Sequence, residues 1–138
     1  MPAESIYIFD ACALIALIER EPGYERLETL LRDPAVESYI HAINLCEVLY
    51  DALRRRPDVS SHRVVANTQN AGLRVCWNTD IALLTRAADH KARWRRVSLA
   101  DCFALALAQT LGGILLTSDH HEFDPLVSAG VKSIGFFR

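Results

Sequence analysis

The sequence predicts an α/β domain in which helices cover both faces of a mainly parallel sheet. Short apolar or β-branched segments alternate with segments of helical apolar spacing along the whole chain, the pattern of successive βα units. The run Ile114–Leu116 is apolar without alternation, which is typical of a strand covered on both faces. No internal repeat, linker or low-complexity segment interrupts the 138 residues, so we expect one domain over 1–138.

The first third of the chain predicts two strands and two helices. Ser5–Phe9 is rich in β-branched and aromatic residues and is expected as a strand. Helical apolar spacing then predicts Ala11–Glu19 and Tyr24–Leu31, separated by a Pro-Gly break. Asp33-Pro34 turns the chain into a second short strand, Ser38–Ile40.

The middle of the chain predicts three helices and one strand. Apolar positions at helical spacing indicate a helix over Ile43–Arg55, which a proline stops. A second helix starts at Ser60 or Ser61, either of which can cap it, and runs to about Ala71. Leu73–Trp77 is expected as a strand, and Ile81 to about Arg93 as the next helix.

The last third begins with a helix that is apolar nearly all round, Leu99–Leu111, which indicates a buried helix. Gly112-Gly113 closes it, as glycine does beyond a helix C-terminus, and the strand Ile114–Leu116 follows. Phe123–Ala129 is expected as a last helix and Val131–Phe137 as a last strand.

Composition excludes several classes of protein. Half of the chain (51%) is hydrophobic, which excludes a disordered protein, and no apolar run approaches the roughly 18 residues of a membrane span. A net charge of −2 excludes a uniformly basic surface. Four scattered cysteines, without a C-x-x-C pair, indicate reduced core residues of a cytoplasmic protein: Cys12, Cys46, Cys76 and Cys102.

Four acids stand in or beside apolar segments of different elements: Asp10, Glu47, Asp101 and Asp119. Each has a local explanation. Asp10 could cap the helix after it, and Ser98 and Asp101 fit a capping box. Glu47 could mark the edge of an amphipathic helix, and Asp119 could shape a turn.

Taken together, the four acids indicate a metal site. Asp10 and Asp119 each follow a predicted strand, and sites in parallel sheets form beyond the strand C-termini. If those two strands are neighbours, the two carboxylates meet. Clustered carboxylates raise one another's pKa unless a cation neutralises them, and oxygen ligands suit Mg²⁺ or Mn²⁺.

The chain resembles the PIN domain family, and within it the VapC toxins of toxin–antitoxin pairs. Four blocks carry the resemblance: Ile8-Phe9-Asp10 with Leu14, then Asn44–Leu49 (NLCEVL), Ser98–Ala106 (SLADCFALA) and Leu115–Asp119 (LLTSD). Their order and spacing cover almost the whole chain. The S-L-A-D and L-T-S-D blocks are the more specific ones.

The resemblance implies a three-layer α/β/α fold with a five-stranded parallel sheet. It implies a Mg²⁺- or Mn²⁺-dependent endonuclease that acts on RNA, an antitoxin partner and a homodimer. Asp10, Glu47, Asp101 and Asp119 would be the metal-binding, catalytic acids. Cys12 replaces the Ser, Thr or Asn that the family often has two residues after the first Asp, and Glu122 is expected to be exposed or just outside the metal ligands.

Other polar residues have weaker functional interpretations. His120-His121, expected in a loop, could suggest zinc or a contact with phosphate, but no third ligand stands at zinc spacing. Two basic clusters are explained as solvated helix ends: Arg54–Arg56 and Lys91–Arg96. If RNA binds, Trp94 could stack on a base while the neighbouring arginines, together with Arg86, hold phosphates. Leucines of the first two helices form core or an apolar groove for a partner helix: Leu14, Leu17, Leu27, Leu30 and Leu31.

The favoured hypothesis is a metal-dependent endoribonuclease in which a metal-activated water attacks an RNA phosphodiester. The alternative is a catalytically inactive PIN-like module that binds RNA or protein. A receiver-like phosphoacceptor domain is a third possibility, but neither Lys91 nor Lys132 follows a strand in the expected way.

Overall fold

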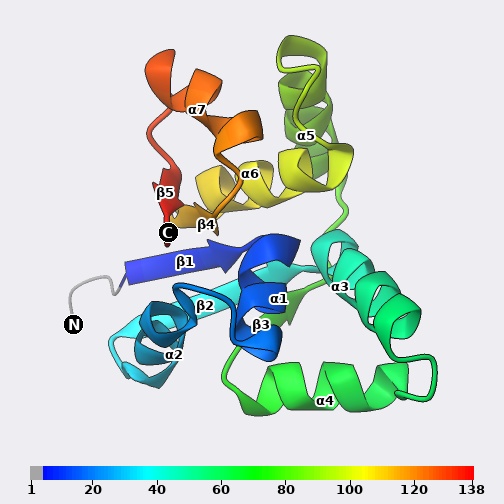
Figure 1. The fold of residues 1–138 in the computed structure, drawn as a ribbon. Coiled ribbons are helices and arrows are strands. Elements are labelled where there is room, and N and C mark those ends of the chain that lie inside the picture. Colours follow the sequence, from blue (N-terminus) through cyan, green and yellow to red (C-terminus); the bar gives the residue numbers. More distant parts are fainter. Residues whose placement is uncertain (1–4) are drawn as a thin grey trace.

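A five-stranded parallel sheet forms the centre of the computed structural model, which describes residues 5–138 (Figure 1). The strand order is β3-β2-β1-β4-β5, and every neighbouring pair is parallel. The strands are β1 (Ser5–Phe9), β2 (Val36–His41), β3 (Arg74–Cys76), β4 (Ile114–Thr117) and β5 (Ile134–Phe136). The predicted α/β fold is therefore confirmed, and its sheet is parallel throughout.

Helices cover both faces of the sheet, as Figure 1 shows. The described helices are α1 (Ala11–Glu19), α2 (Tyr24–Arg32), α3 (Ala42–Arg55), α4 (Ser61–Asn70), α5 (Ile81–Arg93), α6 (Leu99–Leu111) and α7 (His120–Ser128). Ile8 and Leu115 face a core shared with α5, α6 and α7. Phe9 and Leu116, the next residues along the same strands, face a second core shared with α1, α2 and α3. Alternating side chains of β1 and β4 thus hold the three layers together.

Strand β1 lies at the point where the strand order reverses, with β2 on one side and β4 on the other. Phe9 pairs with Leu116, and the Asp10 N–H donates to the Leu116 carbonyl at 3.3 Å. The carboxyl ends of β1 and β4 are therefore adjacent. The two strands that precede Asp10 and Asp119 are thus neighbours, as the predicted metal site requires. This is the place where open parallel sheets form their binding sites.

Several local expectations are wrong, and the last strand, for example, begins at Ile134 and not at Val131. Helix α7 begins at His120, not Phe123, because the Asp119 carboxylate accepts the Glu122 N–H at 2.9 Å and caps the helix. His120 and His121 therefore lie in the first helical turn and not in a loop. Cys46 is exposed and is not a core residue, because it lies on the solvent side of α3; all four cysteines are free.

None of the helices in residues 5–138 combines the length and apolar character needed to cross a membrane.

The connection from α6 to β4 depends on Gly113. A Cβ at this position would lie 2.6 Å from the Ile6 carbonyl oxygen and 2.8 Å from Ile6 Cγ2, so the backbone of β1 would have to move. Gly130 is a useful comparison, because its φ is +95° but a Cβ there would meet nothing within 4 Å.

We predict that Gly113→Ala lowers the free energy of unfolding more than Gly130→Ala does. The second change carries only backbone strain of about 1 kcal/mol, whereas the first also displaces a central strand and should exceed about 2 kcal/mol. Urea unfolding followed by circular dichroism measures both variants. A Gly113→Ala protein as stable as the Gly130→Ala protein would contradict this prediction.

Candidate metal centre

Asp10 is a fully buried carboxylate with one unpaired oxygen. It follows β1 and caps α1, and its Oδ1 accepts the Ala13 N–H at 2.8 Å. Its Oδ2 is buried and has no hydrogen-bond partner in residues 5–138. Burial raises the pKa of Asp10 to about 7, with smaller contributions in the same direction from the charges of Asp119 and Glu47. The Thr117 hydroxyl and the Ala13 N–H act in the opposite direction.

Asp101 lies in the first turn of α6, which brings it to the same end of the sheet. Ser98 caps this helix and accepts the Asp101 N–H at 3.1 Å, so the predicted capping contact is present. The side chain is 8% exposed. Burial raises the pKa of Asp101 to about 10, helped by its contact with Glu122 and by the charges of Asp10 and Glu47.

Asp119 is held by two backbone contacts beyond the end of β4. Its N–H donates to the Thr117 hydroxyl at 3.0 Å, and its carboxylate caps α7 through the Glu122 N–H. Asp101, Asp119 and Glu122 each offer an oxygen, and these oxygens all lie within 4.8 Å of one another. Three carboxylate oxygens at this separation form a donor set that suits a hard divalent cation.

The charges of all four predicted acids act on the thiol of Cys12, although Asp10 and Glu47 lie outside the group of three oxygens within 4.8 Å. Burial raises the pKa of this thiol to about 12, and the charges of four carboxylates contribute in the same direction: Asp10, Asp101, Asp119 and Glu47. Because charge effects fall with distance, these acids, which are spread over 110 residues of sequence, converge in space. At this pKa the Cys12 thiol stays protonated near neutral pH and adds no charge to the site.

Glu47 is exposed on α3, outside the group of three oxygens that lie within 4.8 Å. Partial burial raises its pKa, and the charge of Glu122 adds to this effect. Glu47 therefore lies at the open side of the cluster, while Asp10 lies at its buried side.

Two residues of the site differ from expectation or were not anticipated. Glu122 is half-buried and belongs to the group of three, because the early start of α7 turns its side chain toward Asp101. Asn44 of α3 is fully buried one turn before Glu47, and neither its amide oxygen nor its nitrogen has a hydrogen-bond partner in residues 5–138. In the sequence, Asn44 begins one of the blocks that resemble the PIN domain family, but no role was assigned to it.

The adjacent histidines do not join a metal site within the described residues. His120 contacts Asp124 at 2.9 Å and the Arg138 carbonyl at 3.0 Å, and it stacks on Phe136. Its ring thus joins α7 to the C-terminal segment. His121 is exposed.

Comparison with known proteins identifies the family. A family model described as the PIN domain matches residues 7–125, which contain every acid of this cluster. The chain belongs to the PIN domain family. No curated protein matches it.

Solved structures of VapC toxins share this fold. A toxin–antitoxin complex from Klebsiella pneumoniae superposes with a TM-score of 0.70 at 20% identity, over 96% of this chain and 98% of that one. VapBC2 from Rickettsia felis, bound to a promoter DNA fragment, superposes with a TM-score of 0.71 at 14% identity, over 95% of this chain and 98% of that one. VapC20 from Mycobacterium tuberculosis is described as a sarcin–ricin loop cleaving toxin. It superposes with a TM-score of 0.67 at 20% identity, over 94% of this chain and 98% of that one. At these identities the likeness shows the fold.

We predict that the metal-free protein loses stability as the pH rises. Asp10 and Asp101 keep their protons to a higher pH in the folded chain than in the unfolded one, so the unfolded state binds fewer protons and unfolding becomes easier above about pH 4. The Tm in EDTA should fall between pH 5 and pH 8. Mn²⁺ should raise the Tm more at pH 8, where the competing protons are fewer.

Asp101→Asn should raise the Tm in EDTA at pH 8 by about 4 °C or more, which corresponds to roughly 1 kcal/mol. It should also reduce the shift caused by Mn²⁺. Asp89→Asn, an exposed acid on α5, is the matched control and should change neither value. If Mn²⁺ raises the Tm of Asp101→Asn as much as that of the wild type, Asp101 is not a ligand of the metal.

Proposed function

We propose that this chain is a Mg²⁺- or Mn²⁺-dependent endoribonuclease and the toxin of a toxin–antitoxin pair. The observation that carries the proposal is the convergence of five acids at the carboxyl ends of β1 and β4, with one Asp10 oxygen left unpaired. Membership of the PIN family supports a nuclease, and the VapC neighbours support the toxin assignment.

The residues of the cluster fit a hard divalent cation. Asp101, Asp119 and Glu122 would hold it, with Asp10 behind them and Glu47 at the open side. A bound Mg²⁺ or Mn²⁺ would supply a water of lowered pKa and neutralise charge on the phosphate. The raised pKa values of Asp10 and Asp101 support this proposal, because carboxyl groups buried to this degree are neutralised either by a proton or by a bound cation.

The protein positions these carboxylates before any substrate arrives. Asp10 is fixed by the Ala13 N–H, and Asp119 by its contacts with the Thr117 hydroxyl and the Glu122 N–H. Such fixed acids need no rearrangement during the reaction. We propose Glu47, which is exposed and has a raised pKa, as the group that accepts a proton from the attacking water.

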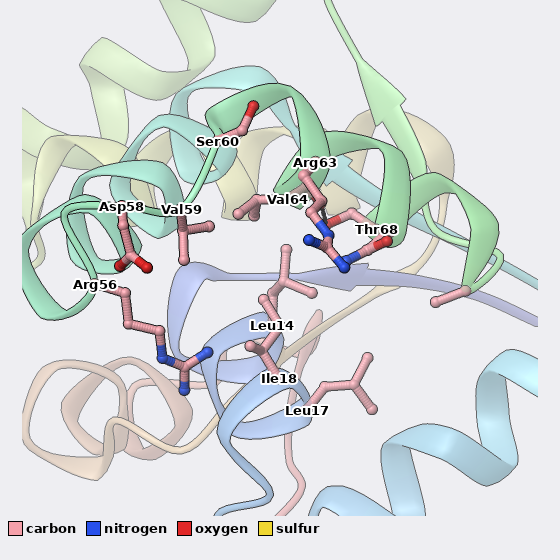
Figure 2. A pocket seen from close by; sticks show the side chains of 12 residues that line it. Leu14, Leu17, Ile18, Arg56, Asp58, Val59, Ser60, Arg63, Val64 and Thr68 are labelled. Carbon is pink, nitrogen blue, oxygen red and sulfur yellow. Dashed lines mark hydrogen bonds between the residues drawn. The ribbon is translucent and has the colours of Figure 1, made fainter.

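An apolar groove offers a surface for the antitoxin. Figure 2 shows Leu14, Leu17 and Ile18 of α1 on one side of a cavity and Val59 and Val64 on the other. The cavity has a volume of about 520 Å³, and Arg56, Asp58 and Arg63 also line it. We propose that an apolar segment of the antitoxin fills it, because the neighbours from Klebsiella, Haemophilus and Salmonella are toxin–antitoxin or VapBC structures. Leu14 lies about 6 Å along the helix axis from Asp10 at 1.5 Å per residue, so a partner in this groove lies close to the acids.

We also propose a homodimer. Most of the exposed large apolar side chains in the described residues come from α3, from the first turn of α5 and the segment before it, and from the first residue of α6: Ile43, Tyr50, Leu53, Trp77, Ile81, Leu84 and Leu99. We propose that the exposed apolar side chains of α3 and α5 are the surface that contacts a second copy of the chain. Light scattering on the purified chain measures the mass directly.

We predict that RNA cleavage needs both the metal and Asp10. Asp10→Asn should keep the helix cap but weaken metal binding, and a loss of several kcal/mol of charge stabilisation corresponds to a roughly hundredfold or greater loss of rate. Cleavage of a structured RNA in Mg²⁺ measures this, with EDTA and Asp89→Asn as controls. Equal cleavage in every arm would mean a contaminating nuclease. Metal binding without any cleavage would favour the inactive binding module.

We predict that Leu17→Glu weakens binding of the antitoxin and leaves RNA cleavage unchanged, because a carboxylate at this position would lose its hydration when an apolar segment covers the groove. Titration calorimetry with the product of an adjoining antitoxin-like reading frame measures binding. Val127→Glu, at an exposed apolar residue outside both the groove and the proposed dimer surface, is the control. Unaltered binding by Leu17→Glu would exclude the groove as the docking site.

A further inference from the structure

A second, smaller pocket lies beside the acid cluster, between the α5–α6 loop and α7. Its volume is about 230 Å³. Arg93, Trp94, Arg95 and Arg96 line one side, and Glu122 and Pro125 line the other. Glu122 is also one of the three acids grouped within 4.8 Å, so the pocket and the proposed metal site share a wall.

The arginines of this pocket are free to bind an anion. The side chains of Arg93, Arg95 and Arg96 have no ion pair or hydrogen bond within residues 5–138, and all three are exposed. By contrast, Arg54 and Arg55 both pair with Asp51. Adjacent like charges repel, so this concentration of cations adds nothing to the stability of the loop.

The loop that carries these arginines is held in one conformation. Lys91 Nζ donates to the Arg95 and Val97 carbonyls, both at 2.8 Å, and the Trp94 N–H donates to the His90 carbonyl at 2.7 Å. Trp94 is half-buried against the core and still lines the pocket. Binding therefore needs little ordering of the backbone.

The size and composition of the pocket point to a nucleotide. A volume of 230 Å³ is below the roughly 300 Å³ of pockets for drug-sized ligands, which favours one small planar ring. Aromatic faces stack unpaired bases, and arginines bind the adjoining phosphates. Arg86 does not contribute, because it lines a separate surface hollow along α5.

We propose that this pocket binds one unpaired nucleotide of single-stranded RNA beside the scissile phosphate, with its base on Trp94 and its phosphates on Arg95 and Arg96. This inference rests on the proposed RNA substrate. It assigns part of the substrate specificity to the α5–α6 loop, because a base held in a duplex cannot reach Trp94. The arginines would offset the repulsion between RNA and the acid cluster.

Intrinsic fluorescence tests the stacking contact. The chain has two tryptophans, so Trp77→Phe leaves Trp94 as the only one, and Asp101→Asn in the same protein prevents cleavage during the titration. A short single-stranded RNA of mixed sequence should quench Trp94, and the same RNA annealed to its complement should not. Quenching by neither RNA, or equally by both, would overturn the inference.

Charge substitutions test the phosphate contacts. Arg95→Ala/Arg96→Ala should weaken RNA binding by roughly tenfold and reduce the slope of log K against log salt by about 1.4, since each phosphate contact on a single strand contributes about 0.7. Arg54→Ala/Arg55→Ala removes the same charge elsewhere and should leave the slope unchanged. Trp94→Leu should lose affinity for RNA, and Trp94→Phe should retain most of it because phenylalanine can still stack on a base. The Tm of each variant shows whether it is folded.

Two further outcomes separate this inference from the proposed function. If the variants change RNA binding as expected but the wild-type chain never cleaves RNA, the nuclease proposal fails and the nucleotide pocket stands. If the wild type cleaves RNA and Arg95→Ala/Arg96→Ala leaves KM unchanged, the pocket assignment fails alone. Loss of antitoxin binding without loss of RNA binding would assign the pocket to the protein partner and overturn the inference.

Discussion

The burial of carboxylates without a counterion is the constraint that explains the rest of this structure. Asp10 is fully buried with a single N–H to one oxygen, and Asp101 is 8% exposed beside another acid. Removing a carboxylate from water without full compensation costs several kcal/mol or forces it to keep a proton. A sequence selected for stability alone would place apolar residues at these positions. The proposed cation therefore explains these acids better than the stability of the fold does.

Helix N-termini make this burial tolerable. Asp10 and Asp119 cap α1 and α7, and Asp101 lies in the first turn of α6. Each N-terminus carries a partial positive charge, and the strand order brings all three to one edge of the sheet. The capping explanation and the metal explanation are thus not alternatives at Asp10, because one oxygen caps the helix and the other stays unpaired.

The sequence predicted what depends on local pattern. Strand β1, helix α1 and the apolar helix α6 have the expected bounds, and the acids follow from their places at element ends. It did not predict the role of Glu122, because the apolar spacing of α7 starts at Phe123 while its first turn is set by the Asp119 cap. The buried state of Asn44 depends on how α3 packs, which no local pattern encodes. The metal set itself stays a prediction.

The distribution of charge at the site is as informative as its acids. Arg95 and Arg96 line the same pocket as Glu122, yet no ion pair joins them among the described residues. A paired arginine would neutralise the cluster and weaken its hold on a cation. The bonds from Lys91 to the loop carbonyls fix the backbone that carries these arginines. The described residues thus form a negative centre with an unpaired positive rim, which is the charge distribution expected for the proposed cation and RNA substrate.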